Sequence, residues 1–158
     1  MTVDSRPETL LHARRVAELM AMILKELLDR SVCHDASKLE DPELAVFNEH
    51  TPKLRDTTYG SPEYRENLKA MGGALQHHYA VNRHHPEHFP DGVNGMTLVD
   101  LIEMLADWKA AGERHDDGDL SASLLIQRDR FDISDQLLAI LRNTADYFGW
   151  FGPTSPSA

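Results

Sequence analysis

Apolar residues recur along this chain with the spacing of a helix, and no segment alternates apolar and polar residues as a half-buried strand does. The longest such pattern covers residues 8–30. One face of that predicted helix carries an apolar set together with a histidine: His12, Val16, Leu19, Met20, Ile23 and Leu27. Shorter helices are predicted over residues 42–49, 62–83, 98–114, 120–130 and 135–148. The chain is therefore expected to be all-α, a single-domain bundle of about six helices.

Capping residues mark several of the predicted helix boundaries. Asp41-Pro42-Glu43 and Ser61-Pro62-Glu63 each place a capping side chain before a proline and an acid in the first turn. Thr97 begins a capping-box pattern. Residues 51–60 contain a proline and a Tyr-Gly pair and are predicted to be a loop. Gly72-Gly73 lies inside a predicted helix, at a cost of about 1 kcal/mol for each glycine, which indicates a kink or a close approach to a neighbour.

The apolar residues of the last three predicted helices are expected to supply the core. They are Leu98, Leu101, Leu105, Trp108, Leu124, Leu125, Ile126, Leu137, Leu138, Ile140 and Leu141. Trp150 and Phe151 are expected to pack back on the bundle. The domain should therefore cover residues 1–151, with residues 152–158 as a disordered tail.

Length, cysteine content and charge limit the partners of the chain. Its 158 residues suffice for one domain with a core of its own, and Cys33 alone cannot form an internal disulfide, which fits a reducing, cytoplasmic setting. No apolar run approaches the roughly 20 residues that span a bilayer. The net charge of −10 argues against extended nucleic-acid binding. A small anionic substrate stays compatible with this charge if a metal and local cations reverse the field in a pocket, and a homo-oligomer is left open.

The segment His34-Asp35-Ala36-Ser37-Lys38 combines the ligand types of a metal site with a cation. An imidazole nitrogen and a carboxylate oxygen together suit a transition metal or magnesium. The ammonium of Lys38 suits a phosphate. A His-Asp pair occurs by chance in many chains, so its meaning depends on the other histidines and acids of the sequence.

A second group of imidazoles follows at the end of the helix predicted over residues 62–83. Five of the nine histidines fall between His77 and His88. His78 follows Met71 by seven residues and should face the core, whereas His85 precedes a proline and should lie in a loop. The alternative is a polar helix end, where histidine is favourable near the negative end of the helix dipole.

Two further residues fit a metal site, each with a structural alternative. His12 lies on the apolar face of the first predicted helix, where a histidine is otherwise a hydrogen-bonded core residue. Asp107 lies in the otherwise apolar run Leu105–Ala111, which indicates a buried carboxylate that is paired or metal-bound.

The order of these residues resembles the H…HD…D ligand pattern of the HD-domain superfamily of metal-dependent phosphohydrolases. In that superfamily the ligands come from separate helices of an α-bundle, so the resemblance implies an HD-like bundle here. It implies four metal ligands, which are His12, His34, Asp35 and Asp107. Members with two metals use two further histidines, and His78 and His85 are the candidates, with His77 and His84 next to them. The HDASK segment is similar to the HDxxK of many members.

Nearly the whole chain, from His12 to about Phe148, also resembles a family of uncharacterised bacterial and phage proteins. Its hallmarks are the blocks HDxSKL, TPxL…YGSxEY, HHYxxNxHHPEH and DLxEMLxDWKAA, all of which are present. The dense HHPEH block departs from most HD enzymes. The assignment of ligands between residues 77 and 88 therefore stays open.

The activity implied by the HD resemblance is hydrolysis of a small phosphate ester, above all a nucleotide. One or two divalent ions (Mn, Fe, Zn or Mg) would polarise the phosphoryl group and activate a water. Lys38, with Arg83 or Arg114, would neutralise the charge on the phosphate. Glu103 and His88 are the candidates for general acid or base, and Tyr79 is a candidate for stacking on the base of a nucleotide.

Three other functions fit the same residues. A closed ligand shell would make the metal structural in a helical binding module without turnover. Paired iron would suit an oxygenase, a chemistry that some HD proteins use. A metal-free interaction protein would leave the inward-facing histidines unexplained.

Overall fold

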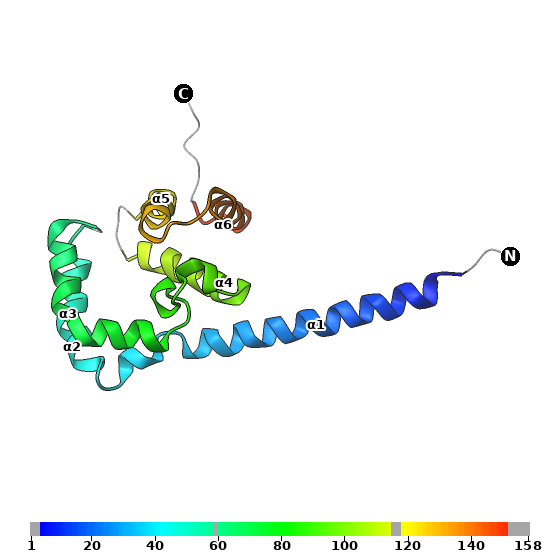
Figure 1. The fold of residues 1–158 in the computed structure, drawn as a ribbon, viewed down its shortest axis with the longest axis horizontal. Helices are drawn as coiled ribbons and strands as arrows, with labels where there is room; N and C mark the ends of the chain where they lie inside the picture. Colours follow the sequence, from blue (N-terminus) through cyan, green and yellow to red (C-terminus); the bar gives the residue numbers. More distant parts are fainter. Residues whose placement is uncertain (1–3, 59, 115–117, 152–158) are drawn as a thin grey trace, which may run out of the picture. The chain divides into compact units, whose positions relative to one another are not determined.

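The computed structural model of the chain describes residues 4–58, 60–114 and 118–151. Within these ranges it contains six α-helices and no strand, which confirms the all-α prediction (Figure 1). The α-helices are α1 (Arg6–Cys33), α2 (Leu44–Arg55), α3 (Pro62–Val81), α4 (Leu98–Gly112), α5 (Leu120–Phe131) and α6 (Asp135–Tyr147). Three short 3₁₀ helices connect them: η1 (Ala36–Leu39), η2 (Pro86–His88) and η3 (Gly92–Gly95). None of the described helices has a stretch long and apolar enough to cross a membrane.

The chain divides into two compact units, Met1–His34 and Asp35–Ala158, so the boundary falls inside the His-Asp pair. In the first unit the structure describes α1, which has no buried residue of its own. Ion pairs four residues apart, such as Arg14–Glu18, line its polar surface. Most of its apolar residues are exposed, as is His12, so the expected core contact of His12 stays a prediction, as does a single domain over residues 1–151.

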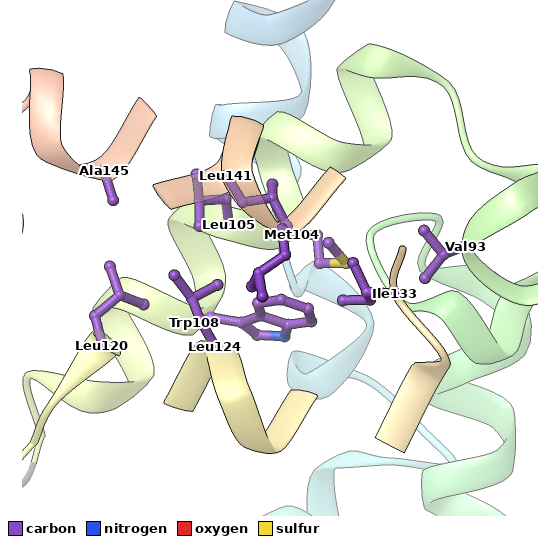
Figure 2. Close-up of a cluster of buried hydrophobic side chains, with 10 residues drawn as sticks. Val93, Met104, Leu105, Trp108, Leu120, Leu124, Ile133, Leu141 and Ala145 are labelled. Carbon is purple, nitrogen blue, oxygen red and sulfur yellow. The ribbon is translucent and has the colours of Figure 1, made fainter. Parts of the chain in front are cut away.

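The core of the second unit lies among α4, α5 and α6. Figure 2 shows apolar side chains from these helices, with Val93 and Ile133 from the connecting segments, converging on one cluster. Trp108 of α4 stacks on Phe131 of α5, with their ring centroids 6.2 Å apart and the ring planes 3° from parallel. Trp150 and Phe151 pack against the same cluster, as expected from the sequence. The expected tail, residues 152–158, lies outside the described residues.

Four residues predicted for the core are exposed instead: Leu98, Leu125, Ile126 and Ile140. The reason is the helical repeat, because consecutive residues project about 100° apart and an apolar run cannot turn every member inward. In the run Leu124-Leu125-Ile126, Leu124 is fully buried and its two successors face outward. The core prediction was wrong at these four positions and correct for Leu105, Trp108, Leu124, Leu138 and Leu141.

Helix α2 differs most from its prediction. It begins at Leu44, after a cis peptide bond between Asp41 and Pro42, so Pro42 precedes the helix instead of opening it. It also continues through Pro52 to Arg55, where a loop was predicted. A proline inside a helix costs about 3 kcal/mol, and packing of α2 on α3 offsets this cost. Tertiary packing therefore outweighs the local signal of the proline.

Helix α3 bends where its two glycines were predicted to disturb it. Gly72 has φ 48° and ψ −119°, which interrupts the helical backbone. A Cβ at this position would meet nothing within 4 Å, so the positive φ, and not a lack of space, favours glycine here. Beyond the kink, the second half of α3 carries His77 and His78. The predicted caps Ser61 and Thr97 are confirmed, since each accepts a hydrogen bond from the backbone three residues on.

Candidate metal centre

Asp35 begins the second unit in a conformation that few residues adopt. Its φ of 58° lies in the left-handed region, which aspartate and asparagine enter more readily than most residues. This turn leads into η1 and brings Lys38 back onto Asp35, so that the Lys38 ammonium lies 2.5 Å from Asp35 Oδ2. The second carboxylate oxygen, Oδ1, is left to face the histidines of α3 and of the segment that follows α3.

His78 projects from the last turn of α3 and is only 1% exposed. Its Nε2 lies 3.3 Å from Asp35 Oδ1 and 2.9 Å from the Nε2 of His85. Its other nitrogen, Nδ1, lies 2.9 Å from Glu43 Oε2. The ring therefore stands between two carboxylates, one on each nitrogen.

His84 repeats this arrangement from the irregular segment between α3 and η2. It is 2% exposed, with its Nε2 3.4 Å from Asp35 Oδ1 and its Nδ1 3.2 Å from Glu103 Oε1. His85 packs its ring against that of His84, with centroids 4.1 Å apart. Burial, followed by the neighbouring His84 and His78, lowers the pKa of His85 to about 3. The His85 imidazole is therefore neutral at physiological pH and has a lone pair to offer.

Nitrogen and oxygen atoms from these residues converge on one point. One ligand atom each from Asp35, His78, His84 and His85 lies within 4.8 Å of the others. Asp107, on α4, brings a carboxylate oxygen within the same distance of Asp35 and His84. Three imidazoles and a carboxylate are ligand types that bind zinc, iron and manganese, so these residues fit a divalent transition metal.

The structure therefore brings together four of the predicted ligands, which are Asp35, His78, His85 and Asp107. His84, which the sequence placed second to His85, joins them. His12 and His34 belong to the first unit, His34 as the residue that ends α1. Their ligation stays a prediction.

The predicted substrate-binding residues have other contacts. Arg83 donates to both carboxylate oxygens of the buried Asp100, each at 3.1 Å, so its guanidinium already has an anionic partner. The Tyr79 ring lies against His85, with centroids 4.9 Å apart. Arg114 is exposed just beyond the end of α4. Their roles toward a substrate stay predictions.

The predicted acid–base residues differ in their distance from the centre. Glu103 contacts His84 directly, which gives it the place of a group that orients a ligand. His88 lies 3.2 Å, through Nδ1, from the backbone oxygen of Tyr79, and its ring packs on Phe89. A catalytic role for either residue stays a prediction.

Sequence reasoning missed Glu43. It was taken as a first-turn acid of a helix, yet its carboxylate is fully buried beside two histidines. Burial raises the pKa of Glu43, but hydrogen bonds with His77, Ser37 and His78 outweigh it and leave the pKa below its ordinary value. Its neighbour Pro42 and the apolar Leu44 gave no sign of this burial.

The low pKa of His85 predicts that the metal-free protein loses stability in mild acid. Below the ordinary pKa of 6.5 the unfolded chain takes up a proton at His85, whereas the folded protein does not until about pH 3. The free energy of unfolding therefore decreases as the pH falls, by on the order of 2 kcal/mol between pH 7 and pH 5. Urea unfolding with a chelator at these two pH values should show a smaller loss for His85→Gln than for the wild type. Equal losses would contradict the prediction.

Comparison with known proteins gives a family without a known activity. A family model described as "Family of unknown function (DUF5662)" matches residues 1–147. No curated protein and no solved structure matches the chain.

Proposed function

The chain belongs to the DUF5662 family, whose function is unknown, and we propose that it is a metal-dependent phosphohydrolase acting on a small phosphate ester. The single observation that carries the proposal is the meeting of two histidine Nε2 atoms, from His78 and His84, at one carboxylate oxygen of Asp35. Each of these histidines has a second carboxylate at its Nδ1.

The chemistry of these groups favours a cation at this point. A carboxylate at Nδ1 favours the tautomer with the proton on Nδ1, which leaves a lone pair on Nε2. Two such lone pairs facing Asp35 Oδ1, at 3.3 and 3.4 Å, repel the carboxylate. A divalent ion bound among them would replace this repulsion by coordination, and His85 and Asp107 are close enough to contribute ligand atoms.

Two features lead us to propose hydrolysis. The candidate ligands follow one another along the sequence in the order typical of HD-type enzymes, and the cationic side chain of Lys38 lies beside them. A bound divalent ion supplies Lewis acidity and an activated water. Lys38 lies at the edge of the centre, half-buried and paired with Asp35 Oδ2, where its ammonium can exchange the carboxylate for a phosphate oxygen. The centroid of the Phe47 ring lies 5.0 Å from the Lys38 nitrogen, so the ring stabilises this charge by a cation–π contact.

A metal-stabilised binding module is the second candidate, and the Lys38–Asp35 contact also favours it. At 2.5 Å this ion pair can lock the ammonium in place and leave no cation for a substrate. In that case the metal would bind and no ester would be hydrolysed.

The test measures metal content and turnover in a wild type and a Lys38→Met variant. After incubation with manganese, iron or zinc, both proteins should hold about one or two equivalents of metal. The wild type should hydrolyse a member of a nucleotide and phosphate-ester panel, and Lys38→Met should lose about 10²–10³-fold in kcat. Lys53→Met is the matched control, because Lys53 forms an exposed pair with Glu49 on α2.

The outcomes separate the two candidate functions. Metal binding without turnover of any ester would favour the binding module. Absence of bound metal in the wild type would remove the basis of both. Equal kcat values for Lys38→Met and Lys53→Met would refute the role of Lys38.

A further inference from the structure

We propose that Glu43 is a positioning residue that holds His78 in the tautomer whose Nε2 can bind a metal. The inference rests on the proposed metal centre. It adds a residue that is not itself among the converging metal-ligand candidates. Glu43 is the residue before α2, and none of its side chain is exposed. A buried carboxylate is costly unless hydrogen bonds compensate it, so its partners indicate what it does.

The donors around Glu43 use both of its oxygens. Oε1 lies 2.7 Å from His77 Nδ1. Oε2 accepts from the Ser37 hydroxyl at 3.1 Å and lies 2.9 Å from His78 Nδ1. An ionised carboxylate only accepts hydrogen bonds, so each of these three groups must point a proton at it.

Asn82 supplies the competing donor near His78. Its side-chain NH₂ group lies 2.8 Å from the Ser37 hydroxyl, 2.9 Å from the backbone oxygen of His78 and 2.9 Å from His78 Nδ1. Its two hydrogens can serve only two of these three acceptors, and an ionised Glu43 has no proton to give. With the amide hydrogens on Ser37 and on the backbone oxygen, the proton between His78 and Glu43 comes from His78 Nδ1, which leaves its Nε2 with a lone pair.

The lone pair of His78 Nε2 faces the metal centre. This nitrogen is the atom that lies 3.3 Å from Asp35 Oδ1 and 2.9 Å from His85 Nε2. Without Glu43 the preference reverses, because Asn82 Nδ2, 2.9 Å from His78 Nδ1, can donate to that nitrogen, and a proton on Nε2 can bond Asp35. A proton on Nε2 blocks coordination. Glu43 therefore determines which nitrogen of His78 carries the proton.

Loss of such a carboxylate partner typically lowers metal affinity about 10–100-fold. A Glu43→Met variant should show a loss of this size for Zn²⁺, measured by calorimetry. Glu43→Gln should lie between the wild type and Glu43→Met, because its amide can present either an oxygen or an NH₂ group to His78. Glu49→Met, on the exposed face of α2, is the matched control and should bind Zn²⁺ like the wild type.

The deciding readout is the tautomer of His78 in the metal-free full-length protein. Nitrogen-15 NMR of the histidine rings, at about pH 8.5 so that imidazoles of ordinary pKa are neutral, distinguishes the two forms. A His78→Gln variant assigns the signals. We expect the Nδ1–H form in the wild type, a mixture in Glu43→Gln and the Nε2–H form in Glu43→Met.

The tautomer measurement tests the role of Glu43, and the Zn²⁺ titration tests the metal centre, so either claim can be refuted without the other. A wild type without Zn²⁺ binding but with the expected tautomers would refute the metal centre and leave the hydrogen-bond assignment intact. A His78 that is Nε2–H in the wild type, or that stays Nδ1–H in Glu43→Gln and Glu43→Met, would overturn the role of Glu43. Should Glu43→Met fail to fold, an unchanged Nδ1–H form in Glu43→Gln alone would overturn it.

Discussion

An Asp35→Asn variant is expected to keep the fold of the wild-type protein and to lose its metal. Asparagine also enters the left-handed region, so the backbone at φ 58° is preserved. The amide can still accept from the Lys38 ammonium, and loss of the charge of this partly buried pair should cost on the order of 1–3 kcal/mol. The carboxylate charge at the meeting point of His78 and His84 disappears, however, and with it the main anionic ligand of the centre.

The expected loss of metal affinity is larger than the roughly 10–100-fold loss that follows when a ligand loses its hydrogen-bond partner. Two measurements report this loss. Calorimetry with Zn²⁺ or Mn²⁺ gives the affinity directly. Thermal unfolding with and without a chelator gives the linked stability, because a metal at 100 times its Kd stabilises the wild type by about 2.7 kcal/mol. Asp35→Asn should show almost none of this metal-induced stabilisation.

Asp132→Asn is the matched control for this experiment. Asp132, after α5, is the other described residue besides glycine with a positive φ, at 51°. It therefore undergoes the same chemical change in the same backbone conformation, away from the converging ligands. Asp132→Asn should bind metal like the wild type. An Asp35→Asn protein that binds metal as tightly as Asp132→Asn would contradict the proposed centre.

Helical periodicity located part of the candidate site correctly. His78 follows Ala74 by about one turn of α3, in the part of the helix beyond the kink at Gly72, and both side chains are buried. Asp107 was predicted from its apolar surroundings on α4, and its carboxylate lies near Asp35 and His84. These predictions needed only the direction of a side chain on one helix, which the sequence determines locally.

The rest of the site depends on contacts between distant segments. His84 and His85 follow the end of α3, where the helical repeat no longer determines direction, and sequence alone did not decide between them. Glu43 lies 35 residues from its partner His78. No local pattern in the sequence indicates that two residues so far apart will pair. Periodicity therefore predicts which residues point inward, and only the three-dimensional arrangement shows which of them meet.

The same distinction applies to the core. The pattern correctly predicted six helices and several of their caps, because caps are local hydrogen bonds. It did not separate Leu124 from Leu125, which are equally apolar neighbours. The direction of packing of α5 on α4 and α6 decides that only the first of them is buried.

Leu124→Ala is therefore expected to destabilise the protein strongly and to leave metal binding intact. The Leu124 side chain is 0% exposed at the centre of the α4–α5–α6 cluster. Removing three carbons from such a site leaves a cavity and costs about 2–5 kcal/mol. The residues of the metal centre come from the turn before η1, from α3 and the segment after it, and from α4, and none of them lies on α5. Urea unfolding with a chelator measures the cost, and Zn²⁺ calorimetry below the unfolding transition measures the affinity.

Leu125→Ala makes the same chemical change one residue away, where the side chain is 41% exposed. It should cost much less, about 1 kcal/mol or below, because less apolar surface is buried and water fills the space. The difference between the two variants measures the orientation of α5 directly. Equal losses of stability would mean that α5 does not present Leu124 to the core. A loss of Zn²⁺ affinity in folded Leu124→Ala would mean that the core and the metal centre are coupled through α4, the helix that carries Trp108 and Asp107.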